Sequence, residues 1–334
     1  MKTYFPDSYK PDMTLYETQE AISLIKRTFQ KQLSKALHLK RVSAPLFVEA
    51  NSGLNDDLNG TEEAVSFKIP DANKRGAIVH SRAKWKRMAL YEYDFFIGNG
   101  LYTDMNAIRK DEKLDNLHSI YVDQWDWEKV ITRDERNITT LKKYVSDIHI
   151  CILETLAEVK KKYPKLKTRI SKRLYFISSE ELLQKYPDLD PKERENRIAR
   201  EKKAVFIIGI GNRLSNGEAH DGRAPDYDDW DLNGDLIYYD DILDCAIELS
   251  SMGIRVDAHS LDRQLSESGH NERRRYRYHK MIMNDELPLT IGGGIGQSRL
   301  CMLLMHKAHI GEVQSSLWDD ETLAKAKEAG VIIL

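Results

Sequence analysis

A glycine-rich segment, IGGGIGQSRL at residues 291–300, restricts the possible folds of this chain more than any other feature. A phosphate-binding loop of the Walker type carries a lysine and then a serine or threonine after its last glycine, but Gly296 is followed by Gln297, Ser298 and Arg299. The dinucleotide-binding fingerprint also fits poorly, because no acidic residue follows about 20 positions later at the end of a second strand. Both common glycine-rich nucleotide sites are therefore disfavoured.

The glycines and the residues after them predict a turn that leads into a buried helix. Residues 300–305, LCMLLM, form an apolar run dense enough for a helix in the core. Arg299 would then lie in the first turn of that helix. Because a buried arginine needs an anion or an aromatic plane as its partner, Arg299 belongs either to a structural ion pair or to an anion-binding site.

Composition and charge exclude several classes of protein. The 334 residues are 41% hydrophobic and 31% charged, which suits one large or two ordinary domains. The net charge of −2 gives no basic excess, so we expect no nucleic-acid partner. No run has the length of a membrane span or the pattern of a signal peptide, so we expect a cytoplasmic protein without membrane contact. The three cysteines lack metal-binding spacing and are expected to be buried thiols.

Helical periodicity predicts two long amphipathic helices. The first begins after Thr14, which has capping-box spacing to Glu17, and it ends near His38. The second covers residues 137–161. The extended segment after the first helix contains Pro45, which restricts it to the edge or end of a sheet.

Most of the remaining elements are predicted strands, and they favour an α+β architecture built on an antiparallel sheet. A charged stretch at 191–203 is expected to be a solvated helix face, and 212–235 to be a long polar loop. The expected strands cover residues 64–69, 77–80, 106–109, 118–128, 173–178, 204–211, 235–241 and 244–257.

Alternation along the strand at 118–128 distinguishes a core face from a pocket face. Trp125 and Trp127 share one face with Asp123, and the tryptophans predict that this face packs in the core. The opposite face ends in three hydrogen-bonding side chains, which suit a pocket wall: Gln124, Asp126 and Glu128.

Acids and arginines recur where a nucleotide site would need them. Aspartates concentrate between Asp226 and Asp244, and Glu248 lies in an apolar strand, where a buried carboxylate must be paired or bound to a metal. Oxygen ligands beside phosphates are what Mg²⁺ prefers. Any one of these acids could instead be an exposed loop residue, and surface ion pairs could explain each arginine. Together they indicate a site for a nucleotide and a carboxylate. The arginines at element ends are Arg109, Arg223, Arg255 and Arg299.

The order of elements resembles the three signature motifs of class II aminoacyl-tRNA synthetases, especially aspartyl-tRNA synthetases. The motifs are the long helix and strand with Pro45, the strand and loop at Arg109, and the glycine segment with Arg299 and its helix. Six long runs in the same order are more similar to ammonia-dependent asparagine synthetases (aspartate–ammonia ligases). They are HSRAKWKRMAL, GLYTDMNAIRKDE, LHSIYVDQWDWE, APDYDDW, ELSSMGIRVD and TIGGGIGQSRL.

The resemblance implies an α+β fold with a class II synthetase-like antiparallel sheet flanked by helices. It implies one catalytic domain over residues 1–334, with a helical and strand insertion at about 133–205, and a homodimer formed through the first helix and strand. The implied reaction is the ATP-dependent amidation of L-aspartate with ammonia to L-asparagine, through a β-aspartyl-adenylate, with release of AMP and pyrophosphate.

The resemblance also implies the roles of individual residues. Arg109 would contact the α-phosphate and the aspartyl group, Arg299 the adenine and the terminal phosphate, and His118 the adenine. Asp235 and Glu248 would hold Mg²⁺, and Glu248 would also belong to the ATP site. Substrate contacts are implied for Ser81, Lys86, Gln124, Asp126, Arg223, Asp228, Ser251 and Arg255.

A carboxylate is also needed to convert ammonium into the nucleophile ammonia. The family position proposed for this role matches Asp56, and the adjacent Asp57 could serve equally. The alternative is that Asp56 caps a turn next to Asn59 and Gly60.

Two other functions remain open from the sequence. An aspartyl-tRNA synthetase should carry an anticodon-binding β-barrel and a basic face, and neither is visible. A non-catalytic sensor of aspartate or asparagine should have lost an arginine or acid of the ATP site, whereas Arg109, Glu248 and Arg299 are present.

Overall fold

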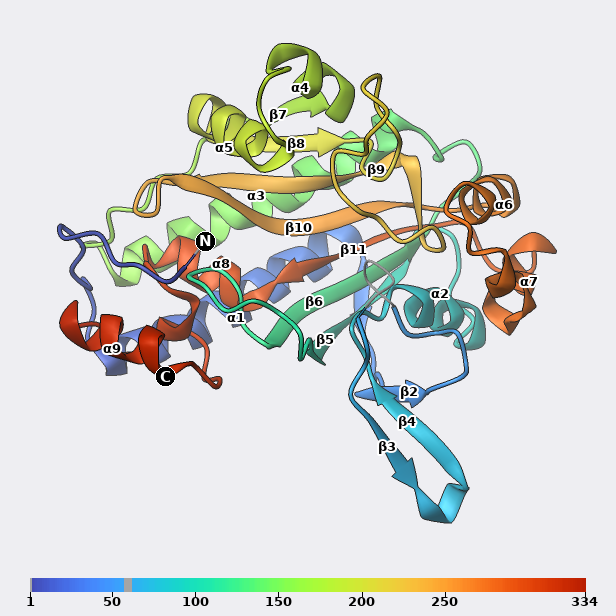
Figure 1. Cartoon of the computed structure of the whole chain (residues 1–334), viewed down its shortest axis with the longest axis horizontal. Coiled ribbons are helices and arrows are strands. Elements are labelled where there is room, and N and C mark those ends of the chain that lie inside the picture. The colour runs from blue at the N-terminus through green and yellow to red at the C-terminus, as the bar shows by residue number, and fades with distance from the viewer. Residues whose placement is uncertain (1, 57–61) are drawn as a thin grey trace.

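The computed structural model describes residues 2–56 and 62–334, and its main body is an eight-stranded sheet (Figure 1). The two outermost pairs of strands are parallel, and the pairs between them are antiparallel. In order across the sheet the strands are β1 (Leu39–Arg41), β5 (Gly100–Ile108), β6 (Tyr121–Val130), β11 (Thr290–Gly296), β10 (Cys245–Arg255), β9 (Asp228–Asp240), β8 (Ala204–Ile208) and β7 (Tyr175–Ser178).

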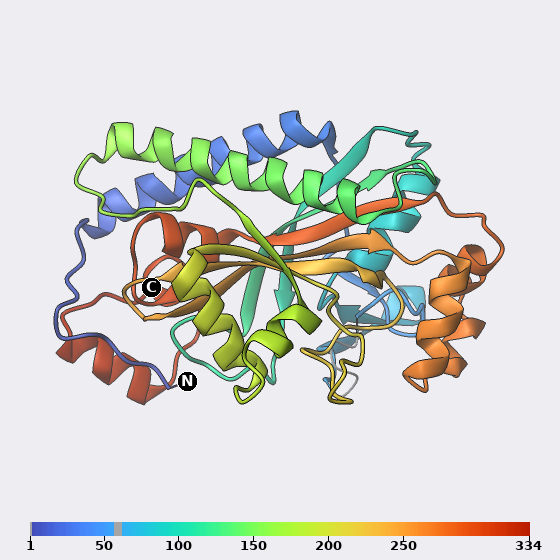
Figure 2. The same cartoon turned by 90° about the horizontal axis from the view of Figure 1, so that it is seen from above.

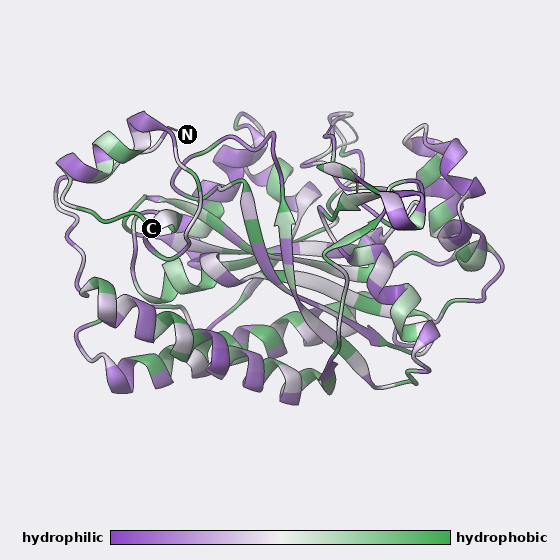
Figure 3. Cartoon of the chain, turned by 90° about the horizontal axis from the view of Figure 1, so that it is seen from below, coloured by the Kyte–Doolittle hydropathy of each residue, from purple (hydrophilic) through white to green (hydrophobic). Residues whose placement is uncertain are grey.

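The two long helices, α1 (Leu15–Leu37) and α3 (Ile138–Lys162), lie side by side along one face of this sheet (Figure 2). Hydrophobic and hydrophilic residues alternate along both of them (Figure 3). Phe29 is fully buried, with its ring centroid 4.7 Å from that of Trp125. The predicted capping box between Thr14 and Glu17 and the helix end at His38 are confirmed.

Shorter helices surround the sheet, and a second, three-stranded sheet projects from one end of it (Figure 1). The small sheet has the order β2 (Phe47–Glu49), β4 (Lys74–Ile78), β3 (Ser66–Ile69). The helices are α2 (Ala83–Glu92), α4 (Ser179–Lys185), α5 (Pro191–Lys202), α6 (Ala258–Glu267), α7 (Arg277–Met283), α8 (Gln297–Leu304) and α9 (Asp320–Glu328), with 3₁₀ turns η1 (Pro70–Ala72), η2 (Asn271–Arg275) and η3 (Ile310–Glu312).

The segment predicted to be an insertion contributes to the same sheet. Its helix α3 packs against α1, and its strand β7 extends the sheet beyond β8. None of the helices in the described ranges is long and apolar enough to cross a membrane. The prediction of buried thiols is confirmed, since all three cysteines are free and buried.

The prediction of a turn at the glycine run was wrong, because these glycines form strand β11 between β6 and β10. Their lack of a side chain serves the close approach of the neighbouring strands. A Cβ on Gly293 would lie 2.5 Å from the Cβ of Met252 and 2.7 Å from the backbone oxygen of Ser251. A Cβ on Gly294 would lie 2.4 Å from Oε1 of Gln124. The predicted helix after the glycines is confirmed as α8.

The other differences concern where elements begin and which face they bury. The predicted polar loop at 212–235 is shorter than expected, because β9 begins at Asp228. Strand β9 can contain buried aspartates because arginines lie beside them, as Arg255 does beside Asp228. The charged stretch at 191–203 is a helix, but it buries a face that includes Glu195. Three strands also differ in extent: β5 starts at Gly100, β6 at Tyr121 and β4 at Lys74.

Replacing Gly293 by alanine should destabilise the fold. The added methyl group meets the backbone of β10, which cannot move away, so we expect the free energy of unfolding to fall by about 1–3 kcal/mol. Gly294→Ala is the matched control, because its methyl group meets only the end of a flexible side chain. Urea unfolding of both variants measures the difference. Equal stabilities would contradict this explanation of the glycine run.

Candidate active site

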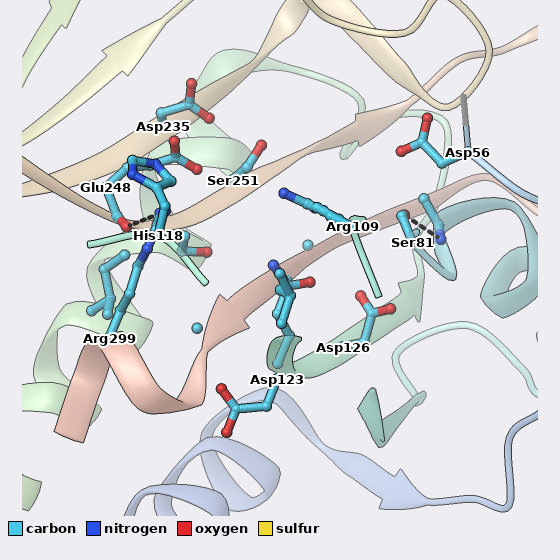
Figure 4. A pocket seen from close by; sticks show the side chains of 18 of the residues that line it. Asp56, Ser81, Arg109, His118, Asp123, Asp126, Asp235, Glu248, Ser251 and Arg299 are labelled. Carbon is cyan, nitrogen blue, oxygen red and sulfur yellow. Dashed lines mark hydrogen bonds between the residues drawn. The ribbon is translucent and has the colours of Figure 1, made fainter. Parts of the chain in front are cut away.

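A cavity of about 390 Å³ lies on the face of the sheet opposite α1 and α3. The alternation predicted for β6 is confirmed for four residues: Trp125 and Trp127 pack in the core between the sheet and the long helices, and Gln124 and Asp126 line the cavity. The prediction was wrong for Glu128, which is fully buried and pairs with Arg255 instead of lining the cavity. The other described side chains predicted for the site all line the cavity: Asp56, Ser81, Lys86, Arg109, His118, Gln124, Asp126, Arg223, Asp228, Asp235, Glu248, Ser251, Arg255 and Arg299. Figure 4 labels nine of them, among them Arg109, Asp126 and Arg299.

Strands β9 and β10 bring two carboxylates and a hydroxyl to one part of the cavity (Figure 4). Asp235 pairs in register with Ser251, and the register shifts between Glu248 and Ser250. Such a β-bulge changes the face on which the following residues lie. It lets Glu248 and Ser251 both line the cavity, although a regular strand would put them on opposite faces.

The charge of Asp235 is only partly balanced. Its Oδ1 lies 2.5 Å from Nη2 of Arg223. Burial, together with the negative charge of Glu248, nevertheless raises the pKa of Asp235 to about 7, although Arg223 acts in the opposite direction. This part of the cavity would therefore be stabilised by a further cation.

Arg109 is a cation without a counter-ion in the described part of the chain. It follows β5, and its backbone N–H donates to the carbonyl oxygen of Ile120 at 2.9 Å. Its side chain extends into the middle of the cavity (Figure 4), where its buried Nε has no hydrogen-bond partner among the described residues. Because a guanidinium remains charged at any physiological pH, this arrangement suits a bound anion.

Arg299 lies in the first turn of α8, as predicted. Its Nη1 donates to the carbonyl oxygen of Glu248 at 2.8 Å, and its Nε to that of Leu117 at 3.4 Å. No carboxylate within the described ranges pairs with it, so the structural ion pair considered from the sequence is not formed there. His118, also predicted for the nucleotide, has its Nδ1 2.8 Å from Oδ1 of Asp115.

All five charged residues predicted to contact the substrate are held in buried ion pairs: Lys86, Asp126, Arg223, Asp228 and Arg255. Lys86 contacts Asp126 and donates to the carbonyl oxygens of Trp127 and Gly293 at 3.0 and 3.1 Å. Burial lowers the pKa of Lys86. The second carboxylate oxygen of Asp126 has no partner among the described residues, so it remains available at the cavity wall.

Arg255 is also buried in an ion-paired cluster. Its Nη2 lies 2.8 Å from Oε2 of Glu128, and its Nη1 contacts Oδ1 of Asp228.

The two remaining predicted residues, Ser81 and Asp56, line the cavity near α2 (Figure 4). The Oγ of Ser81 accepts a hydrogen bond from the backbone N–H of Ala83 at 3.1 Å (Figure 4). Asp56 is buried, and its carbonyl oxygen lies 3.0 Å from Nδ1 of His80. Its alternative Asp57, and the turn residues proposed next to it, lie outside the described residues.

Several lining residues were missed by the sequence analysis. Asp123 was assigned to the core face, which is where it lies, but it also reaches the edge of the cavity. Asp221 and Tyr227 belong to a loop whose acids gave no positional signal. Further lining side chains that were not selected are Glu112, Tyr121, Ser250 and Gln314.

Comparison with known proteins identifies the family. The family model described as aspartate-ammonia ligase matches residues 16–330. The chain belongs to this family. The aspartate–ammonia ligases of Ligilactobacillus salivarius (strain UCC118) and Clostridium perfringens (strain SM101 / Type A) are 55% and 54% identical to this family member over 336 residues, which is 100% of this chain and 100% and 99% of theirs.

Solved structures confirm the expected fold of this family member. The asparaginyl-tRNA synthetase of Entamoeba histolytica in complex with asparaginyl-adenylate matches with a TM-score of 0.65 at 14% identity, over 89% of this chain but only 66% of that one. The Pyrococcus horikoshii enzyme complexed with asparaginyl-adenylate matches with a TM-score of 0.62 at 15% identity, over 94% and 75%. The architecture is therefore that of class II aminoacyl-tRNA synthetases.

The raised pKa of Asp235 predicts a pH dependence of stability. In the fold this carboxyl keeps its proton up to about pH 7, whereas in the unfolded chain it releases it near its ordinary value of 3.8. The ligand-free protein should therefore lose stability from this group as the pH rises between these values. Asp235→Asn lacks this loss, so its free energy of unfolding relative to the wild type should increase over this range and stay constant above it. A difference independent of pH in urea unfolding would contradict the assignment.

Proposed function

We propose that this protein catalyses the ATP-dependent amidation of L-aspartate with ammonia to L-asparagine, through a β-aspartyl-adenylate, with release of AMP and pyrophosphate. Membership of the aspartate–ammonia ligase family supports the reaction. The structural observation that supports it best is Arg109, a cavity arginine without a counter-ion in the described chain, which faces the space between the acidic part of the cavity and Asp126 (Figure 4).

The first step joins two anions that repel each other. A carboxylate of aspartate must approach the α-phosphate of ATP, and fixed cations lower the barrier by stabilising the charge that develops during transfer. Arg109 would contact the α-phosphate and the aspartyl group, and Arg299 the adenine and the terminal phosphate. Asp126, with its unpartnered oxygen, suits the α-amino group of aspartate.

A Mg²⁺ ion is part of the proposed site, with Asp235 and Glu248 as its protein ligands. Within the described ranges no group of three or more His, Cys, Asp or Glu side chains could hold a metal. Mg²⁺ bound with a nucleotide, however, needs only one or two carboxylates, because water and phosphate oxygens complete its coordination. The incomplete charge balance at Asp235 fits such a cation. When bound, Mg²⁺ would neutralise phosphate charge.

The second step needs neutral ammonia, although ammonium predominates at neutral pH. Asp56 is the proposed proton acceptor among the described residues. It lies in the cavity wall near Tyr227.

The proposed oligomer is a homodimer formed through α1 and β1. Large apolar side chains are exposed near these elements, as a subunit interface would require. Tyr16 on α1 is 74% exposed, and Phe96 and Ile97, just before β5, are 68% and 60% exposed.

The proposed reaction predicts which nitrogen source supports turnover. With aspartate, ATP and Mg²⁺, we expect ammonium to yield asparagine and AMP in equal amounts, and neither glutamine nor tRNA to replace it. Chromatographic detection of asparagine, AMP and aspartyl-tRNA separates this enzyme from a tRNA-charging one. Product with glutamine but not with ammonium, or charging of tRNA, would reject the proposal.

The two cavity arginines should be needed for turnover but not for folding. Arg109→Ala and Arg299→Ala each remove transition-state charge stabilisation, so we expect kcat/KM to fall by about 10²–10³-fold. Arg197→Ala is the control, because this arginine is 58% exposed and pairs with Glu201 on the outside of α5. Circular dichroism should give the same folded spectrum for all three variants. Near-normal turnover of either cavity variant would refute the role given to that residue.

A further inference from the structure

Asp123 has no role in the proposed reaction, yet its carboxylate is almost fully buried. It lies on the core face of β6, and in Figure 4 its side chain points away from Arg109. Its side chain is 6% exposed, and its Oδ2 lies 3.0 Å from Nζ of Lys26 on α1. A buried carboxylate needs such partners, and both of its oxygens have them.

The second oxygen of this carboxylate caps helix α8. Oδ1 of Asp123 accepts hydrogen bonds from the backbone N–H of Ser298 at 3.0 Å and from Nε2 of Gln314 at 3.2 Å. The residue in the N-cap position of α8 is Gly296, which has no side chain that could act as a cap. A carboxylate at this end also interacts favourably with the helix dipole. Asp123 therefore supplies from β6 the cap that the helix itself lacks.

The capped turn carries the nucleotide arginine. Arg299 directly follows Ser298, and its guanidinium extends from this turn to the carbonyl oxygen of Glu248. A shift of the turn would move the guanidinium with it. The first turn of α8 thus connects Lys26, on the outer helix α1, with the cavity.

We propose that Asp123, held in place by Lys26, is a positioning residue that fixes the first turn of α8 and so places Arg299 for the nucleotide. The inference rests on the proposed function, in which Arg299 contacts ATP. Two of its consequences would not be expected of a purely structural ion pair. Loss of Asp123 should weaken the binding of ATP but not of aspartate, and Lys26 should affect ATP binding only through Asp123.

The test compares single and double variants of the full-length protein. Asp123→Asn keeps the size of the side chain but removes its charge and one acceptor oxygen. We expect it to weaken Mg²⁺–ATP binding in calorimetry by about tenfold and to raise the KM for ATP equally, with the KM for aspartate changed by less than about twofold. Lys26→Met should have a smaller effect of the same kind.

The double variant tests whether Lys26 acts through Asp123. If it does, the double variant Lys26→Met with Asp123→Asn should bind ATP no more weakly than Asp123→Asn alone, because the effects of substitutions within one interaction network do not add. The matched control is Lys143→Met, which breaks the exposed pair with Asp147 on α3 at 3.3 Å and should leave ATP binding unchanged.

Three results would overturn the inference. The first is that Asp123→Asn lowers the free energy of unfolding without a selective loss of ATP affinity. The second is that the effects of the two substitutions on ATP binding are fully additive in the double variant. The third applies if Asp123→Asn fails to fold, and it is an unchanged ATP affinity in Lys26→Met. Failure of the proposed function is distinguishable, because it would appear as absence of asparagine in the wild type. The binding measurements do not depend on turnover.

Discussion

The cavity depends on the pairing of buried carboxylates with buried cations. Asp126 lies against Lys86, Glu128 and Asp228 against Arg255, and Asp235 against Arg223, all on the side of the sheet away from the two long helices. Removing one partner from such a pair leaves an uncompensated buried charge, which is more destabilising than the net contribution of the pair itself. These pairs therefore hold the strand ends in one arrangement and keep the polar wall compatible with a folded core.

The pairing is incomplete in two places, and those places are where ligands are proposed to bind. Arg109 lacks a counter-ion in the described chain, and Asp235 carries a raised pKa because Arg223 does not offset burial and Glu248. The described part of the cavity therefore contains an unbalanced positive charge, at Arg109, and an incompletely balanced carboxylate, at Asp235. This combination suits an anionic substrate that binds together with a cation. The ligand-free protein can fold with the charges of both groups incompletely balanced because Arg109 is only partly buried and the carboxyl of Asp235 can hold a proton.

Periodicity predicted much of the fold and of the site. The capping box at Thr14 and the helical spacing from there define α1, and the alternation of Trp125 and Trp127 with Gln124 and Asp126 defines both faces of β6. These features are local, so they can be read without knowing the partners. The positions of charged residues indicated Glu248 and the arginines at element ends, and the resemblance supplied the other site residues, which no periodicity marks.

The errors arose where a residue is chosen for what approaches it from elsewhere in the chain. Gly293 suggests a turn by composition, but its reason is the β10 backbone next to it, which is far away in sequence. Asp228, as a charged residue among other aspartates, suggests a loop, but it begins strand β9, where its ion pair with Arg255 allows the carboxylate to be buried. Asp123 was grouped with the tryptophans because of its phase, and the phase is correct. Alternation along β6 cannot show that the N-cap of α8 is a glycine, which has no side chain to cap the helix. The carboxylate of Asp123 supplies this cap from the core face of β6, and the hydrogen bond offsets the cost of burying it.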